Sequence, residues 1–336
     1  MRDRKFEWLE VMRGLAAVWV LLHHASQSVT HFVGSIGVVP MITNGYLGVD
    51  FFFVLSGFII ASSSRGILDK GGGVRDYVWA RAIRIYVPYL PVGLGLYLLY
   101  LALPGLSQGD RSPSLFTSVS LLPSNDPPAL SVAWTLVHEM VFYAIFSVWF
   151  YSKRVLWALL LVWALCILVV WQINFELGRF WSYFLSPLNL CFILGVGIFH
   201  LTRLVTMAKN HAALAAISGT ALVVVQAAEI SPDRSMVAVG FGLIVIAAAS
   251  PIAVHRPVWS WLLSLGTASY AIYLVHNPIE SIAVRGLMMF VPGASPWLSL
   301  VAISLIALAS GLAYWWFYET PALRIVRKWT FKVRGG

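Results

Sequence analysis

Apolar segments of about 20 residues recur along the whole chain and are separated by short polar stretches. An α-helix of that length crosses the roughly 30 Å hydrocarbon core of a bilayer. The segments do not alternate between apolar and polar positions, as strands of a membrane barrel would. The pattern predicts an all-α fold, a polytopic integral membrane helical bundle of about ten transmembrane helices. The predicted spans are 8–29, 45–64, 86–104, 133–151, 155–173, 182–201, 211–228, 235–250, 262–284 and 296–318.

Composition points to the same solvent. Of the residues, 59% are hydrophobic and only 11% are charged, which is too apolar for an ordinary water-soluble domain. The formal net charge of +9 does not indicate a nucleic-acid partner, because the basic residues lie in short loops between apolar spans and not on one soluble face. Cys166 and Cys191 fall inside spans without metal-ligand spacing, so we expect neither a disulfide framework nor a metal site.

The distribution of loop Lys and Arg predicts the topology. An even number of spans puts both termini on one side, and cytoplasmic loops carry the excess of basic residues. One side receives only Arg111, Arg179, Arg234 and Arg285. The other side receives Arg2, Arg4, Lys5, Arg65, Lys70, Arg75, Arg81, Arg84, Lys153, Arg154, Arg203, Lys209, Arg256, Arg324, Arg327, Lys328, Lys332 and Arg334. We therefore expect both termini in the cytoplasm, with an uncleaved first helix and one domain over residues 1–336.

Two connections are long enough to have structure of their own. Residues 74–86 read as an amphipathic helix that would lie in the membrane interface, with Pro88 and Pro91 beginning the next span. The outer loop 105–132 is rich in Ser and Pro, and it either covers a site or only links helices.

Ionisable side chains inside the spans are functional candidates, because burying them in hydrocarbon is costly. Arg13 and His24 are eleven residues apart, about 20° from the same helix face. A snorkelling arginine and a packed histidine are the structural alternative. Asp50 begins a run with three phenylalanines, and it either needs a partner or caps its helix.

Glu139 also lies in an apolar span. Thr135, Glu139 and Tyr143 recur at a spacing of four and share a helix face, so the carboxylate should look into the bundle. A structural ion pair, with Arg13 or with His138, is the alternative.

A polar stripe at helical spacing runs along the ninth predicted span, formed by Ser269, Tyr273, His276 and Glu280. The topology then puts His24, Asp50, Glu139 and His276 at similar depth in four helices. Such convergence suits an acid/base site, and it equally suits a proton-coupled transporter.

Arg81 and Arg84 share one face of the amphipathic segment, with Tyr77 and Tyr86 nearby. Guanidinium groups bind phosphates in a bidentate manner, so the pair suits a phosphorylated cytosolic donor. Attraction to anionic membrane lipid is the alternative.

Taken together, these motifs resemble acyltransferase family 3, whose members O-acylate carbohydrates. The resemblance is collinear from about residue 9 to residue 321, nearly the whole chain. It rests on Arg13 and His24; Gly48-Val49-Asp50 and Ser56-Gly57-Phe58; Arg81 and Arg84; Trp134 to Tyr143; Ser269, Tyr270, Tyr273, Leu274 and His276; and Glu319-Thr320-Pro321. One departure is Leu9-Glu10-Val11-Met12-Arg13 where many members have Leu-Asp-Gly-Leu-Arg, a variant that resembles the stand-alone exopolysaccharide-modifying members.

The resemblance implies an enzyme of the bacterial inner membrane that moves an acyl group, with acetyl expected, from cytosolic acetyl-CoA to a carbohydrate or lipid-linked glycan. His24 would be the general base, or would carry the acyl group transiently. Asp50 or Glu139 would orient its ring, and Arg13 would position the thioester. The remaining implied contacts are Arg81, Arg84 and Tyr86 for the donor, and Trp134, His138, Tyr273 and His276 for the acceptor.

Two other classes fit parts of the pattern. A proton-coupled transporter or a flippase of a lipid-linked glycan would use the same buried histidines and carboxylates as a relay. A noncatalytic scaffold would not need so many ionisable groups at one depth. Slow hydrolysis of acyl-CoA without acceptor would separate the enzyme from both rivals.

Overall fold

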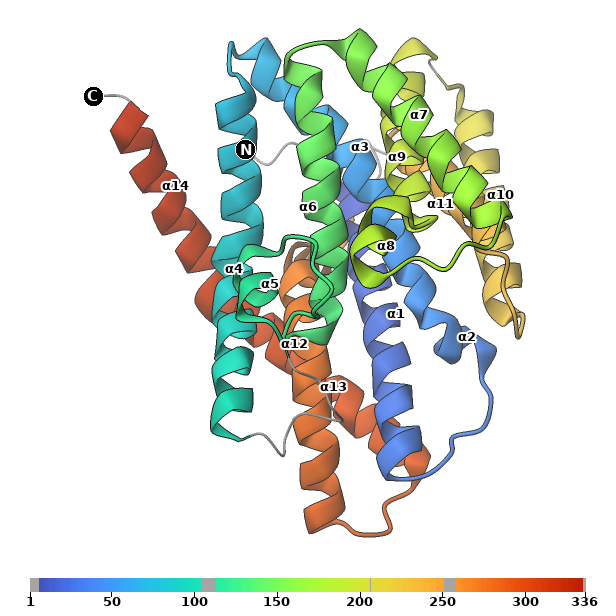
Figure 1. The fold of residues 1–336 in the computed structure, drawn as a ribbon. Coiled ribbons are helices and arrows are strands. Elements are labelled where there is room, and N and C mark those ends of the chain that lie inside the picture. Colours follow the sequence, from blue (N-terminus) through green and yellow to red (C-terminus); the bar gives the residue numbers. More distant parts are fainter. Residues whose placement is uncertain (1–5, 104–112, 206, 251–257, 335–336) are drawn as a thin grey trace. The chain divides into compact units, whose positions relative to one another are not determined.

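The computed structural model describes residues 6–103, 113–205, 207–250 and 258–334, and every regular element in that part of the chain is helical (Figure 1). Arg2, Arg4, Lys5, Arg111 and Arg256 of the predicted topology lie outside the described residues. The α-helices are α1 (Glu7–Phe32), α2 (Pro40–Thr43), α3 (Gly48–Asp69), α4 (Val74–Ala102), α5 (Leu115–Ser120), α6 (Trp134–Phe146), α7 (Lys153–Gln172), α8 (Arg179–Leu185), α9 (Leu188–Leu204), α10 (Lys209–Ala228), α11 (Arg234–Ala248), α12 (Ser260–Phe290), α13 (Pro296–Tyr314) and α14 (Thr320–Arg334).

Among these residues, seven helical stretches are long and apolar enough to cross a membrane. The shorter helix α11 is also apolar. The predicted class, an all-α polytopic membrane protein, is confirmed, and the number of about ten spans stays a prediction.

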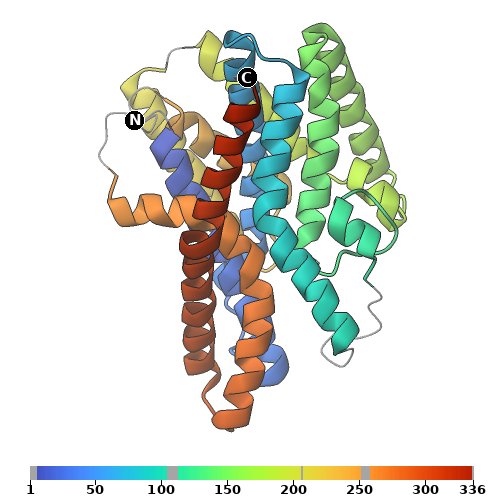
Figure 2. The same ribbon diagram turned by 90° about the vertical axis from the view of Figure 1, so that its left-hand side faces the viewer.

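The chain divides into two compact units. The first unit comprises Met1–Ile60 and Leu194–Trp315, and in it α1 packs against α12 and α13, while α10 packs against α11. Figure 2 shows α12 and α13 running side by side. The buried residues at the centre of the three-helix group are Ala17, Leu21, Ala268, Ile272 and Ala307.

Glycines let the helices of the first unit approach closely. A Cβ added to Gly14 of α1 would lie 2.8 Å from the backbone nitrogen of Gly266 in α12. A Cβ added to Gly311 of α13 would lie 2.7 Å from Cα of Ile272. Small residues at such positions favour helix association in lipid. Lipid provides no hydrophobic driving force between helices, and small residues allow the close van der Waals packing of backbones that replaces it.

The second unit comprises Ala61–Ile193 and Trp316–Gly336. Its helix α6 contacts α8, and α4 contacts α14. Aromatic rings fill its interior: Phe142 stacks on Phe192 with 4.4 Å between centroids, and the Trp163 indole donates to the Phe184 carbonyl over 2.6 Å.

One predicted boundary, at a proline, was wrong. Residues 74–86 do not form a separate interfacial helix, since α4 continues to Ala102 with Pro88 and Pro91 inside it. Neighbouring groups in a bundle can satisfy the carbonyls that a proline frees, so a membrane helix tolerates it. The predicted span 182–201 falls within the membrane-spanning stretch Arg179–Leu204, which is interrupted between α8 and α9. Pro187 disfavours a helical conformation at Ser186, whose backbone is extended.

Candidate active site

Two histidines from distant parts of the sequence meet in the first unit. The rings of His24 in α1 and His276 in α12 lie 5.3 Å apart between centroids, and Tyr273 lies 5.6 Å from His276. The His276 ring is fully buried, and its Nδ1 is 3.1 Å from the carbonyl oxygen of Ile272. Because a carbonyl only accepts, Nδ1 carries the proton and Nε2 of the neutral ring is an acceptor. That Nε2 has no hydrogen-bond partner among the described residues.

His24 is half-buried, and it is surrounded by residues of α1 and by the turn that holds Tyr46. Gln27, one turn along α1, hydrogen-bonds its ring. His23 touches the His24 ring at 5.0 Å and the Tyr46 ring at 5.5 Å. The turn that holds Tyr46 is fixed by Asn44, which donates to the Ala227 and Glu229 carbonyls over 3.1 and 2.7 Å. The face of α1 that carries His24 therefore packs against side chains that other contacts hold in place.

Arg13 joins α1 to α12. Its Nε donates to the Ser269 hydroxyl over 2.7 Å, and its Nη2 donates to the Gly266 carbonyl over 2.9 Å. These two hydrogen bonds hold the half-buried Arg13 side chain against α12. Arg13 and His24 thus face the same neighbouring helix, as their spacing predicts.

Asp50 pairs with a residue that sequence reasoning did not single out. Arg234 of α11 donates from Nε to one carboxylate oxygen over 3.0 Å, and from Nη2 to the other. The Asp50 side chain is 1% exposed and that of Arg234 is 46% exposed. The guanidinium also lies over the Tyr46 ring, 5.6 Å from its centroid, so the ion pair is linked through Tyr46 and His23 to His24. A signal was present, since a buried aspartate needs a cation and Arg234 is one of four basic residues on the predicted outer side.

A different polar cluster lies in the second unit. Arg81 is buried, donates to the Ser63 hydroxyl over 2.7 Å and lies 5.8 Å from the centroid of Tyr143. The Tyr143 hydroxyl donates to Glu139, and the Tyr77 hydroxyl donates to the Tyr143 carbonyl over 3.0 Å. The predicted common face of Glu139 and Tyr143 is present, and it meets Arg81 of α4.

Arg84 is half-buried beside this cluster on α4. Tyr86, predicted as a donor contact, turns its hydroxyl to the Ser120 carbonyl at the end of α5. Tyr89 likewise donates to the Ser118 carbonyl over 2.7 Å. The two tyrosines hold α5 against α4. The Tyr86 hydroxyl therefore binds the segment 113–131 and does not point toward the arginine pair.

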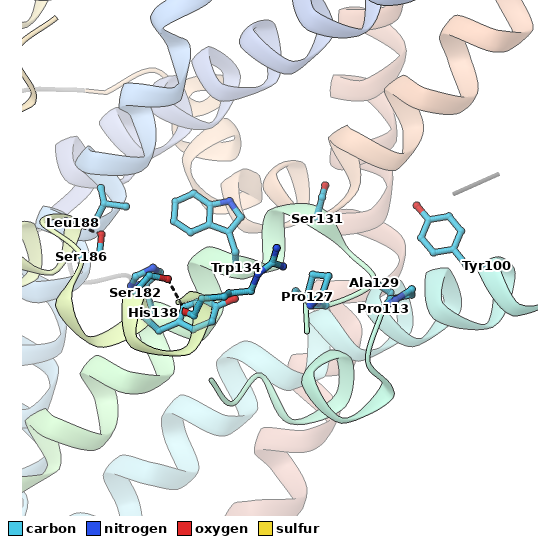
Figure 3. A pocket seen from close by; sticks show the side chains of 13 residues that line it. Tyr100, Pro113, Pro127, Ala129, Ser131, Trp134, His138, Ser182, Ser186 and Leu188 are labelled. Atoms are coloured by element: carbon cyan, nitrogen blue, oxygen red, sulfur yellow. Dashed lines mark hydrogen bonds between the residues drawn. The ribbon is translucent and has the colours of Figure 1, made fainter. Parts of the chain in front are cut away.

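A cavity of about 470 Å³ opens in the second unit (Figure 3). Residues that line it include Tyr100, Ser131, Trp134, His138, Arg179 and Ser182. The described part of the outer loop 105–132 forms one wall, so this loop does more than link helices. Its residues 105–112 lie outside the described residues.

Comparison with known proteins assigns the chain. The family model for the acyltransferase domain of acyltransferase family 3 matches residues 6–325. The chain belongs to acyltransferase family 3. It is 29% identical to the exopolysaccharide production protein ExoZ of Rhizobium meliloti over 327 residues, which cover 91% of this chain and 95% of that protein. It is also 29% identical to protein 2 in the picA locus of Rhizobium radiobacter over 167 residues, 43% of this chain and 82% of that protein. No solved structure matches.

In this family 3 acyltransferase the candidate residues fall into two groups. The first unit brings together Arg13, His24 and His276, with Asp50 linked to them through its ion pair. The second unit holds Glu139 with Arg81. Because Glu139 and His24 belong to different units, a contact between them stays a prediction. Within the described residues no three His, Cys, Asp or Glu side chains form a metal-binding group.

Proposed function

We propose that this acyltransferase moves an acetyl group from cytosolic acetyl-CoA to a hydroxyl of a carbohydrate such as an exopolysaccharide, O-antigen or lipid-linked glycan. Its relation to an exopolysaccharide production protein supports the acceptor class. We place it in a bacterial inner membrane with both termini in the cytoplasm, on the strength of its loop charges. The observation that carries the proposal is the contact of His24 with His276, whose acceptor nitrogen has no partner among the described residues.

His24 acts as the general base. Its neutral ring takes the proton of the acceptor hydroxyl as the oxygen attacks the thioester carbonyl, so a C–O bond forms and the C–S bond breaks. The proton then passes from His24 to the departing thiolate, which balances the reaction. The ring of His276 lies against that of His24, so His276 is the residue in the same unit that positions the base.

Donor phosphates bind at the arginine pair. Arg81 Nε is buried without a hydrogen-bond partner among the described residues, so a donor N–H remains for an anion. Arg84 follows three positions later on the same face of α4. Tyr143 and Ser63 hold the Arg81 guanidinium in place, which lowers the entropic cost of binding a phosphate.

The acceptor occupies the cavity beside Trp134 and His138. Its lining suits a sugar, because aromatic rings pack against the C–H faces of a sugar ring and hydroxyl groups form hydrogen bonds with the sugar hydroxyls.

Calorimetry of acetyl-CoA binding to the purified protein tests this proposal. Saturable binding by wild type that is lost in the Arg81→Gln/Arg84→Gln variant is expected. Arg84→Gln alone serves as a second variant, because the half-buried Arg84 is less costly to replace than the buried Arg81. Arg75→Gln is the matched control, an exposed arginine on the same helix.

Folded wild type that binds no acetyl-CoA would overturn the proposal and favour transport of a glycan. Unchanged acetyl-CoA binding in both variants that lack Arg84 would indicate that the arginine pair binds anionic membrane lipid and not the donor.

A further inference from the structure

The cavity in the second unit has features that select among carbohydrates. We infer that it binds an acidic sugar, whose carboxylate pairs with Arg179. This inference rests on the proposed function and adds to it the chemical class of the acceptor.

The walls of the cavity suit a sugar ring. Trp134 is exposed at the surface of α6 and meets His138 edge to face, with 5.6 Å between ring centroids. His138 in turn lies 5.1 Å from Tyr183 of α8. Trp134 and His138 of α6, Ser182 of α8 and Tyr100 of α4 all line the cavity (Figure 3). Such a mixture of aromatic and hydroxyl groups is typical of sites for neutral and acidic sugars alike.

Asn189 fixes this wall before any ligand arrives. Its amide nitrogen donates to the Tyr183 and Phe184 carbonyls, each over 3.0 Å, so its Oδ1 must face Nδ1 of His138 at 3.2 Å. An amide oxygen only accepts, and His138 Nδ1 therefore carries a proton. A wall held by three hydrogen bonds, two of them buried, loses little freedom when a ligand binds.

Charge decides the class of sugar. Among the described residues that line the cavity, Arg179 alone is charged, and it is exposed. No carboxylate from the described lining neutralises it, and its guanidinium has no hydrogen bond or ion pair with the rest of the described chain. A guanidinium binds a carboxylate through two parallel hydrogen bonds, whereas a neutral sugar gives it no charge to pair with.

The same geometry argues against a diphosphate. A pyrophosphate carries several charges and calls for more than one cation, and the described lining supplies one. Ser182 adds a hydroxyl in the middle of α8, where it donates to the Arg179 carbonyl over 2.6 Å and keeps its lone pairs for ligand hydroxyls.

The test measures binding of two disaccharides that differ in one group. Cellobiouronic acid carries a carboxylate where cellobiose carries a primary alcohol, and ligand-observed NMR on the purified protein detects millimolar affinities. Wild type should bind the acid about tenfold more tightly than cellobiose. Arg179→Gln should remove that preference and leave cellobiose binding unchanged, and Trp134→Ala should weaken both sugars. Arg154→Gln, an exposed arginine outside the cavity, is the control and should change nothing.

Several results would overturn the inference. Equal affinity of wild type for the two disaccharides would do so, as would absence of binding by both at millimolar concentration or an acid preference that survives in Arg179→Gln. Inorganic pyrophosphate that displaces the acid at equal concentration would reassign the cavity to a phosphate group. A loss of acetyl-CoA affinity in Arg179→Gln would assign it to the donor. The same preparations report acetyl-CoA binding, so failure of the acidic-sugar inference is distinguished from failure of the acyltransferase proposal.

Discussion

The histidine cluster of the first unit comprises His24 and His276, and the arginine cluster of the second unit comprises Arg81 and Arg84. Both place ionisable groups among apolar helices, but the histidine cluster leaves hydrogen-bond acceptors without partners, whereas the arginine cluster leaves a donor. In the histidine cluster the buried atoms without hydrogen-bond partners among the described residues include Nε2 of His276 and both carboxylate oxygens of Glu280, one turn further along α12. In the arginine cluster the corresponding atom is Nε of Arg81, while Glu139 accepts from Tyr143.

This difference separates two tasks. An imidazole nitrogen and a carboxylate can accept protons, whereas a guanidinium N–H can only donate a hydrogen bond, which suits an anionic ligand. Leaving such atoms unpaired costs about 1–3 kcal/mol each, so they indicate where a substrate completes the hydrogen bonding. We therefore expect variants of the first unit to change the rate of the chemical step, and variants of the second unit to change substrate affinity.

The largest expected effect is that of His24→Ala. Loss of the general base should lower kcat by about 10²–10⁴-fold while leaving the acetyl-CoA dissociation constant unchanged. Turnover with labelled acetyl-CoA and calorimetry on the same preparation measure the two quantities. His31→Ala is the control, because this exposed histidine lies near the end of the same helix. Near-normal turnover in His24→Ala would remove the base from the mechanism.

Next in size is the effect of separating α1 from α12. In Gly266→Ala the new methyl group would overlap the Glu10 carbonyl, and overpacking of this kind costs about 1–3 kcal/mol. The unfolding temperature in detergent and the turnover rate should both fall, because the contact of His24 with His276 depends on the close approach of α1 and α12. Gly286→Ala on the same helix meets nothing within 4 Å and should be neutral. Equal behaviour of the two variants would mean that close packing of α1 and α12 is dispensable.

The Asp50–Arg234 pair should respond asymmetrically. Arg234→Gln leaves a carboxylate with 1% exposure unpaired, at a cost of about 1–3 kcal/mol, whereas Asp50→Asn leaves a half-exposed guanidinium that water can solvate. Unfolding temperatures should therefore fall more for Arg234→Gln. The opposite order would indicate that Asp50 acts mainly through another partner. The double variant, compared with both single ones, gives the coupling energy.

The smallest effect is expected for Arg84→Gln. Loss of one charge-assisted hydrogen bond should raise the KM for acetyl-CoA about tenfold, with kcat changed little. Steady-state kinetics over a range of acetyl-CoA concentrations measures both. A fall in kcat at constant KM would blur the division of labour between the two units.

Much of the candidate chemistry could be predicted from sequence because it depends on helical periodicity. The common face of Glu139 and Tyr143 follows from their spacing and appears as a hydrogen bond within α6. Arg13 and His24 likewise share a face that meets α12. The membrane class follows from the length of the apolar segments alone.

The pairing between helices could not be predicted in this way. Asp50 and Arg234 are 184 residues apart, and no local pattern relates them. The fold pairs Asp50 with an arginine that no local pattern indicates, and the role of Asp50 in orienting His24 stays a prediction. Prolines were equally ambiguous, since Pro187 separates two helices while Pro88 lies inside one.

The sequence by itself determined the membrane-embedded helical class, the family and the direction in which each polar side chain leaves its own helix. The tertiary structure decided which of these side chains meet, which atoms stay available and where the cavity lies. Periodicity fixes a residue's angle about one helix axis, but contact between helices depends on how closely their backbones approach. At Gly14 and Gly266 that approach is a property of two distant segments together.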